Sequence, residues 1–235
     1  MTVPVTAAPI IALEGIDGSG KGTQAQLLRD ALIAQGSKAT LISFPRYTDT
    51  FFGARIGEFL NGKFGALEDL DPFLISLLYA GDRLESRDTL LNAAAESDIV
   101  ILDRYVASNV AHQSAKRTGN ERRQLQEWIE HIEFEIHGLP RPTLTLLLDL
   151  PVDISQELIQ QKSQRAYTDR KTDLQEADVS YMQSVREAYL DLAERSSGWQ
   201  TISVLDGTNL RSRDDIASEI AAHVATSGRG MERAQ

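Results

Sequence analysis

Ile10-Ile11-Ala12-Leu13-Glu14-Gly15-Ile16-Asp17-Gly18-Ser19-Gly20-Lys21-Gly22-Thr23 is the stretch that decides the fold of this chain. An apolar run suited to a strand passes into a glycine-rich loop, and a helical pattern follows. Gly15 and Gly20-Lys21 match the G-x-x-x-x-G-K pattern of a P-loop, in which backbone N–H groups surround a phosphate chain and the lysine reaches its β and γ oxygens. The helix adds its unpaired N-terminal donors. We therefore expect a nucleotide site whose ATP-binding residues are Gly15, Ile16, Asp17, Gly18, Ser19, Gly20, Lys21, Gly22 and Thr23.

One position departs from the strict P-loop pattern. Gly22 stands where a serine or threonine usually supplies a hydroxyl to Mg²⁺, and the hydroxyl comes one residue later, at Thr23. A glycine-rich turn that binds no ligand is the alternative interpretation. The apolar strand before the loop and the helical pattern after it favour the nucleotide site.

Length and composition limit the class of protein. The 235 residues, 42% of them hydrophobic, suit one α/β domain. The sequence has no cysteine, which excludes a disulfide framework and suits a reducing cytoplasm. A formal charge of −10 argues against nucleic acid bound on a broad basic surface, and no apolar run approaches the ~18 residues of a membrane span. We expect a cytoplasmic protein with neither a membrane nor a nucleic-acid partner.

Five apolar segments alternate with helical patterns, and we predict them to be strands at residues 10–14, 39–43, 98–102, 143–150 and 201–205. This order predicts an α/β fold with a five-stranded parallel sheet flanked by helices in three layers, the architecture of P-loop NTPases. We expect one domain over residues 1–226, with one long helix over 71–95, a further helix over 122–137, a lid at about 162–174 and a disordered tail over 227–235. Ligands of such sheets bind at the carboxyl ends of the strands.

Charged residues gather at those carboxyl ends. Asp103 ends the third strand as a Walker B carboxylate does, where it can hold Mg²⁺ directly or through water. Arg104, next to it, needs an anion at that depth, and a phosphate accepts its planar fork. Arg46 follows Pro45 in a loop, and Arg83 lies in the long helix. For Arg46 and Arg83, a solvated side chain or an ordinary ion pair is the alternative.

The polar stretch at 162–174 contains Arg165 and Arg170, which suit a lid that closes over a transferring phosphate. A solvated loop is the alternative. Two phosphate sites that face each other suit phosphoryl transfer between nucleotides, in which catalysis is mainly positioning and charge neutralisation. A phosphate acceptor needs no general base. We therefore expect packing or surface roles for the histidines, which are His112, His131, His137 and His223.

These motifs resemble those of thymidylate kinases, the ATP-dependent dTMP kinases of the nucleoside monophosphate kinase group. The resemblance extends over residues 10–193 and is firm at residues 14–21, 44–47, 79–83 and 103–109, which include Phe44-Pro45-Arg46 and Asp103-Arg104-Tyr105. It implies Mg²⁺ as cofactor, ATP as co-substrate and transfer of the ATP γ-phosphoryl group to dTMP. It also implies a homodimer, for which the apolar helix at 71–95 would suit the interface.

The resemblance implies roles residue by residue. The catalytic residues would be Lys21, Asp17, Arg104, Arg165 and Arg170, and the Mg²⁺ ligands Asp103 and Asp17. The dTMP-binding residues would be Asp17, Phe44, Pro45, Arg46, Tyr79, Arg83, Arg104, Tyr105, Ser108, Asn109 and Gln113. Within that set, Arg46, Arg83 and Arg104 would bind the phosphate, Tyr79 would stack on thymine, and Tyr105 would line the sugar pocket. His112 stands where the family usually has Tyr or Phe near the sugar C2′, which leaves discrimination against ribose open.

Two rival functions remain at this stage. The same chemistry could act on another pyrimidine nucleotide or on a deoxynucleoside, and the latter would require a carboxylate base, for which Glu14 is the local candidate. A catalytically silent nucleotide-binding regulator is the second rival. The presence of Lys21, Asp103 and Arg104 together counts against it.

Overall fold

A parallel sheet of five strands forms the centre of the computed structural model, which describes residues 8–66, 69–161 and 178–232. The strands lie in the order β2-β3-β1-β4-β5, and every neighbouring pair is parallel. Their bounds are β1 (Ile10–Glu14), β2 (Ala39–Ser43), β3 (Ile99–Asp103), β4 (Leu144–Asp149) and β5 (Trp199–Ser203). The predicted sheet is confirmed, with strand ends that differ by at most two residues. All five carboxyl ends therefore lie at one edge.

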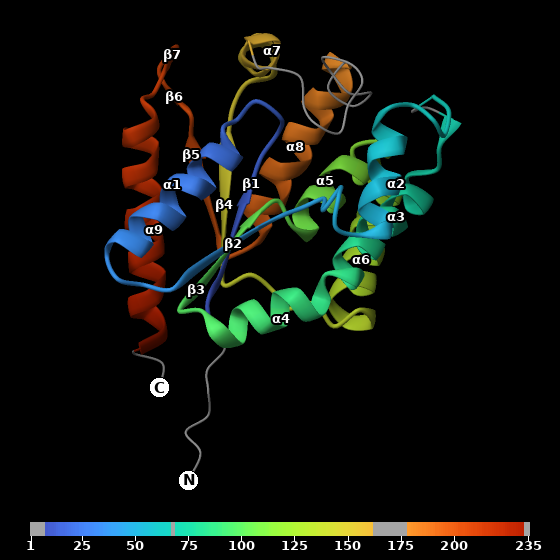
Figure 1. Ribbon diagram of the computed structural model, residues 1–235. Helices are drawn as coiled ribbons and strands as arrows, with labels where there is room; N and C mark the ends of the chain where they lie inside the picture. Colours follow the sequence, from blue (N-terminus) through green and yellow to red (C-terminus); the bar gives the residue numbers. More distant parts are fainter. Residues whose placement is uncertain (1–7, 67–68, 162–177, 233–235) are drawn as a thin grey trace.

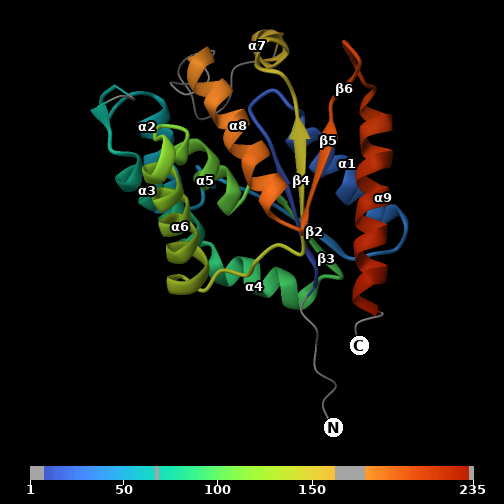
Figure 2. The ribbon, with the colours of Figure 1, turned by 180° about the vertical axis from the view of Figure 1, so that it is seen from behind.

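Helices cover both faces of this sheet (Figures 1 and 2). On one face, α1 (Lys21–Ala34) and α9 (Arg213–Glu232) bury Leu28, Ile216 and Ile220 against the strands. On the other face lie α5 (Val106–Ser114) and α8 (Val179–Arg195), which contribute Val110 and Val185 to a second core. The three central strands, β1, β3 and β4, read as nearly continuous apolar runs because both of their faces are buried, whereas the edge strands β2 and β5 are more exposed.

A group of helices extends beyond the sheet on the α5 side, as Figure 2 shows. It contains α2 (Phe51–Leu60), α3 (Pro72–Glu85) and α6 (Gly119–Glu130), and α4 (Arg87–Glu96) leads back to the sheet. Asp71 caps α3 by accepting from the Phe73 N–H at 2.8 Å, and Pro72 occupies the first turn. Ile56, Phe59 and Ile75 form a small core between α2 and α3.

The prediction of a continuous helix is wrong in two places. The helix expected over 71–95 is interrupted at Ser86, whose hydroxyl donates to the Asp82 carbonyl at 2.8 Å. Such a side-chain bond competes with the backbone ladder of a helix. The helix expected over 122–137 ends at Glu130 and continues as a π-helical turn, η2 (His131–Ile136), which buries Glu133 completely.

The C-terminal tail expected from residue 227 is also wrong in part, because α9 continues to Glu232. The hydroxyls of Thr226 and Ser227 donate to the carbonyls of Ala222 and His223, four residues earlier, so both residues are accommodated within the helix. The short strands β6 (Leu205–Asp206) and β7 (Asn209–Leu210) were not predicted. The predicted lid at 162–174 lies outside the described residues. Within the described ranges, no helix has both the length and the hydropathy needed to cross a membrane.

Candidate active site

The P-loop joins β1 to α1, and its conformation requires glycine at two positions. Gly15 has φ 139°, and a Cβ there would lie 2.5 Å from the Leu148 carbonyl oxygen. Gly18 has φ 83°, and a Cβ there would lie 2.8 Å from the Ser155 carbonyl oxygen. These values are too short for any side chain. Ser155, on α7 (Val152–Gln161), also donates its hydroxyl to the Asp17 carbonyl at 2.5 Å, which ties α7 to the loop.

Lys21 lies at the first position of α1 with its ammonium turned back into the loop. Its Nζ donates to the Ile16 carbonyl at 2.7 Å and lies 3.5 Å from the Ser19 hydroxyl. Burial lowers the pKa of Lys21 to about 7, and the positive charge of Arg104 adds to the effect. A bound phosphate chain would supply the negative charge that favours the protonated form.

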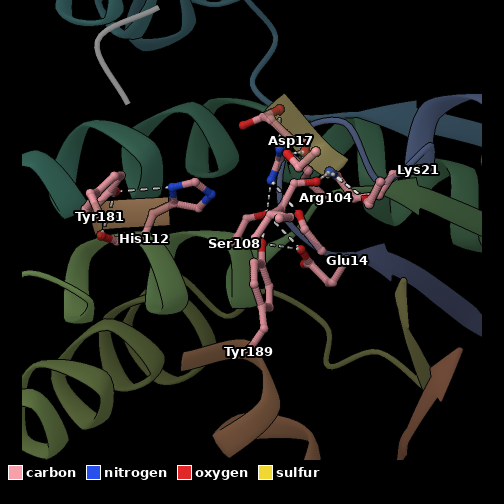
Figure 3. Close-up of polar contacts among 12 residues, drawn as sticks. Glu14, Asp17, Lys21, Arg104, Ser108, His112, Tyr181 and Tyr189 are labelled. Carbon is pink, nitrogen blue, oxygen red and sulfur yellow. Dashed lines mark hydrogen bonds and ion pairs between the residues drawn. The ribbon is translucent and has the colours of Figure 1, made fainter. Parts of the chain in front are cut away.

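Arg104 occupies the turn after β3 and extends across the mouth of the loop (Figure 3). Its Nη2 donates to Asp17 Oδ1 at 2.7 Å, and its Nη1 donates to the Gly15 carbonyl at 3.3 Å and to the Ser108 hydroxyl at 3.1 Å. Burial opposes the charge, but Asp17 and the other anionic groups nearby outweigh it and raise the pKa of Arg104. The structure thus brings Asp17, Lys21 and Arg104 together, as the sequence predicted.

Asp103 lies directly against the start of α1. Its Oδ2 would be 3.0 Å from a Cβ at Gly22, so the carboxylate occupies the space beside the residue that lacks the usual hydroxyl. Asp103 and Asp17 both act electrostatically on Lys21. The described residues contain no cluster of three or more His, Cys, Asp or Glu side chains able to hold a metal. Two carboxylates fit a Mg²⁺ ion that takes its other ligands from phosphate and water.

A second polar network lies between α3, α5 and η2. Arg83 is 2% exposed and forms a bidentate ion pair with Glu133, in which its Nη2 is 2.6 Å from Oε1. The interaction with Glu133 outweighs burial and raises the pKa of Arg83. Asn109 donates to the same Oε1 at 2.8 Å and to the Ser76 carbonyl at 3.0 Å. Arg83 of α3 therefore pairs with a residue of η2. Its contact with the dTMP phosphate remains a prediction.

Two buried polar atoms of α5 have no partner among the described residues. They are the Oδ1 of Asn109 and the Nε2 of Gln113, from side chains that are 1% and 0% exposed. Buried polar groups are rarely left unsatisfied, since each costs about 1–3 kcal/mol. An acceptor and a donor on one helix suit the polar edge of a bound base.

The other predicted dTMP residues have partners within the protein. Arg46 pairs with Asp49 at 3.1 Å, and Phe44 is 4% exposed with its ring 6.0 Å from that of Tyr105. Tyr105 donates its hydroxyl to the Pro140 carbonyl at 3.0 Å, and Tyr79 lies edge-on to Phe59 at 6.5 Å. Contacts of these side chains, and of Pro45, with a nucleotide remain predictions. Arg165 and Arg170 lie outside the described residues.

His112 is buried on α5 beside two tyrosines of α8. Its Nδ1 is 3.2 Å from the Tyr181 hydroxyl, and its ring is perpendicular to that of Tyr189 at 6.3 Å. Burial lowers the pKa of His112 to about 3, and the Arg104 charge contributes, so the ring is neutral at physiological pH. This neutral, enclosed histidine fits the packing role expected from the sequence.

Sequence reasoning missed three contributors to the site. Ser155 and Tyr189 carry no motif, and Glu133 lies in a segment read as an ordinary helix. Glu14 was considered only as a possible base, but it is 0% exposed and accepts three hydrogen bonds. The one signal in the sequence for the role of Glu14 was the presence of an acidic residue at the end of an apolar strand.

The profile of the protein family described as Thymidylate kinase matches residues 13–213. The chain belongs to the thymidylate kinase family. It is 34% identical over 190 residues to the thymidylate kinase of Mycobacterium tuberculosis, covering 81% of this chain and 87% of that protein. It is 34% identical to the thymidylate kinase of Deinococcus radiodurans over 219 residues, covering 93% and 97%. The predicted ATP-dependent dTMP kinase activity is confirmed by these matches.

A solved structure supports the fold independently. The thymidylate kinase of Candida albicans superposes with a TM-score of 0.72 at 24% identity, covering 94% of this chain and 93% of that one. At that identity the likeness concerns the fold, and it agrees with the five-stranded parallel sheet and its flanking helices.

Proposed function

We propose that Lys21 and the P-loop amides bind the ATP phosphates while Arg104 binds the dTMP phosphate, so that the γ-phosphoryl group passes between them. The observation that carries this proposal is the Arg104 guanidinium, held 2.7 Å from Asp17 at the mouth of the P-loop. Arg104 and Lys21 lie in one pocket, where the charge of Arg104 lowers the pKa of Lys21 and the charge of Asp17 favours the protonated form of both. Two fixed cations suit a reaction that moves negative charge from one phosphate to another.

Asp17 and Asp103 would hold Mg²⁺. When bound, the ion would neutralise charge on the β- and γ-phosphates. The position of Asp103 supports this role, since its carboxylate lies beside Gly22 at the start of α1. Asp17 also orients Arg104 through their ion pair.

The acceptor base would lie against α5. Asn109 Oδ1 and Gln113 Nε2 offer an acceptor and a donor without partners among the described residues. Thymine presents a donor and acceptors on its edge, so the two atoms are complementary to it. Tyr79, Phe44 and Pro45 would supply the apolar contacts, with Arg46 and Arg83 on the phosphate side.

The ATP base would lie on the other side of the P-loop. A cavity of about 400 Å³ opens there, between Gly18 and Gly20 of the loop, Leu158 of α7 and the segment that carries Arg211 and Arg213. Its size suits a nucleoside. Arg165 and Arg170 would close over the phosphates from the lid, which stays a proposal.

The rival functions are less well supported by this geometry. A deoxynucleoside kinase would need Glu14 as a base, but both Glu14 oxygens already accept hydrogen bonds from donors of the protein. A silent regulator would not need Lys21, Asp103 and Arg104 in one pocket. The proposal includes a cytoplasmic location, because the reaction consumes ATP and the cysteine-free sequence suits a reducing compartment.

A coupled ADP-release assay tests the proposal, with ATP, Mg²⁺ and a panel of dTMP, dUMP, UMP, AMP, dCMP and thymidine. We expect strong preference for dTMP. Arg104→Ala should lower kcat/KM for dTMP by at least ~10²-fold and leave ATP binding nearly intact, because a bidentate phosphate contact is lost. An unchanged rate would refute the role of Arg104, and turnover centred on another acceptor would refute the base assignment.

A homodimer is the second part of the proposal. Exposed apolar side chains gather on α3 and α6, where Leu74 is 62% exposed and Trp128 is 54% exposed. The two helices pack together through Phe73 and Trp128, whose ring centroids are 5.5 Å apart. Exposed apolar side chains on neighbouring helices are typical of an interface.

Sedimentation velocity tests the dimer. Leu74→Asp should shift the protein toward monomer because it places a charge in the proposed interface. Ile33→Asp is the matched control, since Ile33 is 51% exposed on α1, which lies on the opposite side of the sheet. A monomeric wild-type protein would contradict this part of the proposal.

A further inference from the structure

Glu14, the last residue of β1, is completely buried and lies at the centre of a hydrogen-bond network (Figure 3). Its Oε1 accepts from the Tyr105 backbone N–H at 2.8 Å. Its Oε2 accepts from the Ser108 hydroxyl at 2.7 Å and from the Tyr189 hydroxyl at 3.1 Å. Three donors, two on the β3–α5 connection and α5 and one on α8, thus meet on one carboxylate.

The first of these bonds acts on the backbone of Arg104. Arg104 has φ 66°, a left-handed conformation that is uncommon and strained for a residue with a side chain. Its own N–H donates to the Leu13 carbonyl at 3.0 Å, and the next N–H, that of Tyr105, donates to Glu14. The peptide groups on both sides of Arg104 are therefore held by the end of β1.

The second bond acts on the side chain of Arg104. The Ser108 hydroxyl has one proton, which it donates to Glu14, so its oxygen is left to accept from Arg104 Nη1 at 3.1 Å. The Tyr189 hydroxyl lies 2.7 Å from the same oxygen. The Glu14 carboxylate thereby sets the direction of the chain of hydrogen bonds that ends on the guanidinium.

We propose that Glu14 is a positioning residue for phosphoryl transfer: with Ser108 and Tyr189 it holds the turn at Arg104 so that the guanidinium faces Asp17 and the acceptor phosphate. The inference rests on the proposed role of Arg104 and assigns a role to a carboxylate that touches no substrate. Burial raises the pKa of Glu14, while the bonds from Ser108 and Tyr105 and the charges of Arg104 and Lys21 lower it. The pKa stays above its ordinary value, so the groups that Glu14 orients offset part of the cost of burying it.

Glu14→Gln is the principal test. A glutamine amide presents an N–H on one side, which would face either the Tyr105 N–H or the hydroxyls of Ser108 and Tyr189. In the first case two donors oppose each other, and in the second Ser108 must turn its proton elsewhere. We expect kcat/KM for dTMP to fall about 10- to 100-fold, because small misplacements of a positioned group have effects of that order. ATP binding, measured with a fluorescent ATP analogue, should change little.

Tyr189→Phe and Tyr181→Phe form a matched pair on α8. Both tyrosines are buried, but the Tyr181 hydroxyl donates to the His112 carbonyl at 2.9 Å and makes no bond to Glu14 or Ser108 in the described structure. Loss of the hydrogen bond from the Tyr189 hydroxyl to the Glu14 carboxylate in Tyr189→Phe should lower kcat/KM about 3- to 10-fold. Tyr181→Phe should leave it within about twofold of wild type. This pair keeps the test available if Glu14→Gln yields no soluble protein.

A double-mutant cycle separates positioning from general loosening of the fold. If Glu14 acts through Arg104, adding Glu14→Gln to Arg104→Lys should cost less than about twofold in kcat/KM, whereas independent effects would multiply. Multiplying losses, or wild-type turnover by both Glu14→Gln and Tyr189→Phe, would overturn the inference. Failure of the proposed function is distinguishable, because it would appear as loss of dTMP turnover in the wild-type protein or as an Arg104→Ala variant with normal kinetics.

Discussion

We predict that the folded protein loses stability in acid because the buried His112 side chain must be protonated there. The side chain is 7% exposed, and the groups that face it are Arg104, Lys21 and Lys116, which oppose its charge, and Asp17, which favours it. The Tyr181 hydroxyl donates its only proton to the His112 carbonyl at 2.9 Å, so its oxygen accepts from Nδ1–H at 3.2 Å. The burial and the nearby positive charges therefore favour a neutral imidazole, with its proton on Nδ1.

The sign and size of this change in the free energy of unfolding follow from the pKa values of His112 in the folded and unfolded states. The folded pKa is about 3, below the ordinary value of 6.5, so the unfolded chain binds the proton more readily between these limits. Stability from this group is complete above the unfolded pKa and is lost as the pH falls below it. At about pH 5 the loss is about 2 kcal/mol, because each pH unit below the unfolded pKa costs about 1.36 kcal/mol and pH 5 lies roughly 1.5 units below it.

Urea denaturation of wild type and His112→Asn at about pH 7.5, 6 and 5 measures the effect, because the asparagine cannot titrate. Other acidic groups contribute equally to both proteins, so the difference between their free energies of unfolding isolates His112. We expect that difference to move by about 2 kcal/mol in favour of the variant at the lowest pH. Parallel losses in the two proteins would refute the reasoning and mean that His112 is charged inside the fold or loses no proton affinity there.

Three further predictions concern other parts of the site. Gly15→Ala should abolish ATP binding or soluble expression, because its Cβ would lie 2.5 Å from a backbone carbonyl; normal binding in a titration would show that the loop adapts. Glu133→Gln should lower the thermal midpoint by roughly 10 °C, since an unpaired buried charge costs about 3–5 kcal/mol, and an unchanged melt would mean that Arg83 finds another partner. Arg165→Ala or Arg170→Ala should depress kcat more than dTMP affinity. Normal turnover by both would make them ordinary surface charges.

Local pattern was sufficient for the sheet and the loop. The strands at residues 10–14 and 39–43 were predicted with the bounds that the structure shows, because short segments rich in apolar residues between glycine and proline signals have few other interpretations. The parallel arrangement also followed, since strands separated by helices must cross over. Lys21, Asp103 and Arg104 could be placed in one pocket because parallel strands present their carboxyl ends at the same edge.

Irregular helix boundaries could not be read in this way. The break at Ser86 and the π-helical turn at residues 131–136 leave the apolar periodicity almost intact. They arise where a side chain satisfies a backbone carbonyl or is drawn toward a partner in another element, such as Glu133 toward Arg83. Periodicity reports which face is buried and carries no information on such partners.

The sequence by itself therefore determined the fold class, the phosphate-binding loop and the family, because each is encoded in contiguous residues. Only the tertiary structure decided what surrounds Arg104. The partners of Glu14 lie 91, 94 and 175 residues away along the chain, and those of Arg83 lie 50 residues away. Contacts over such separations depend on how helices pack on the sheet, which no local pattern specifies. For this reason the sequence suggested Glu14 only as a possible base, and the tertiary structure was needed to show that it is a buried acceptor of three hydrogen bonds.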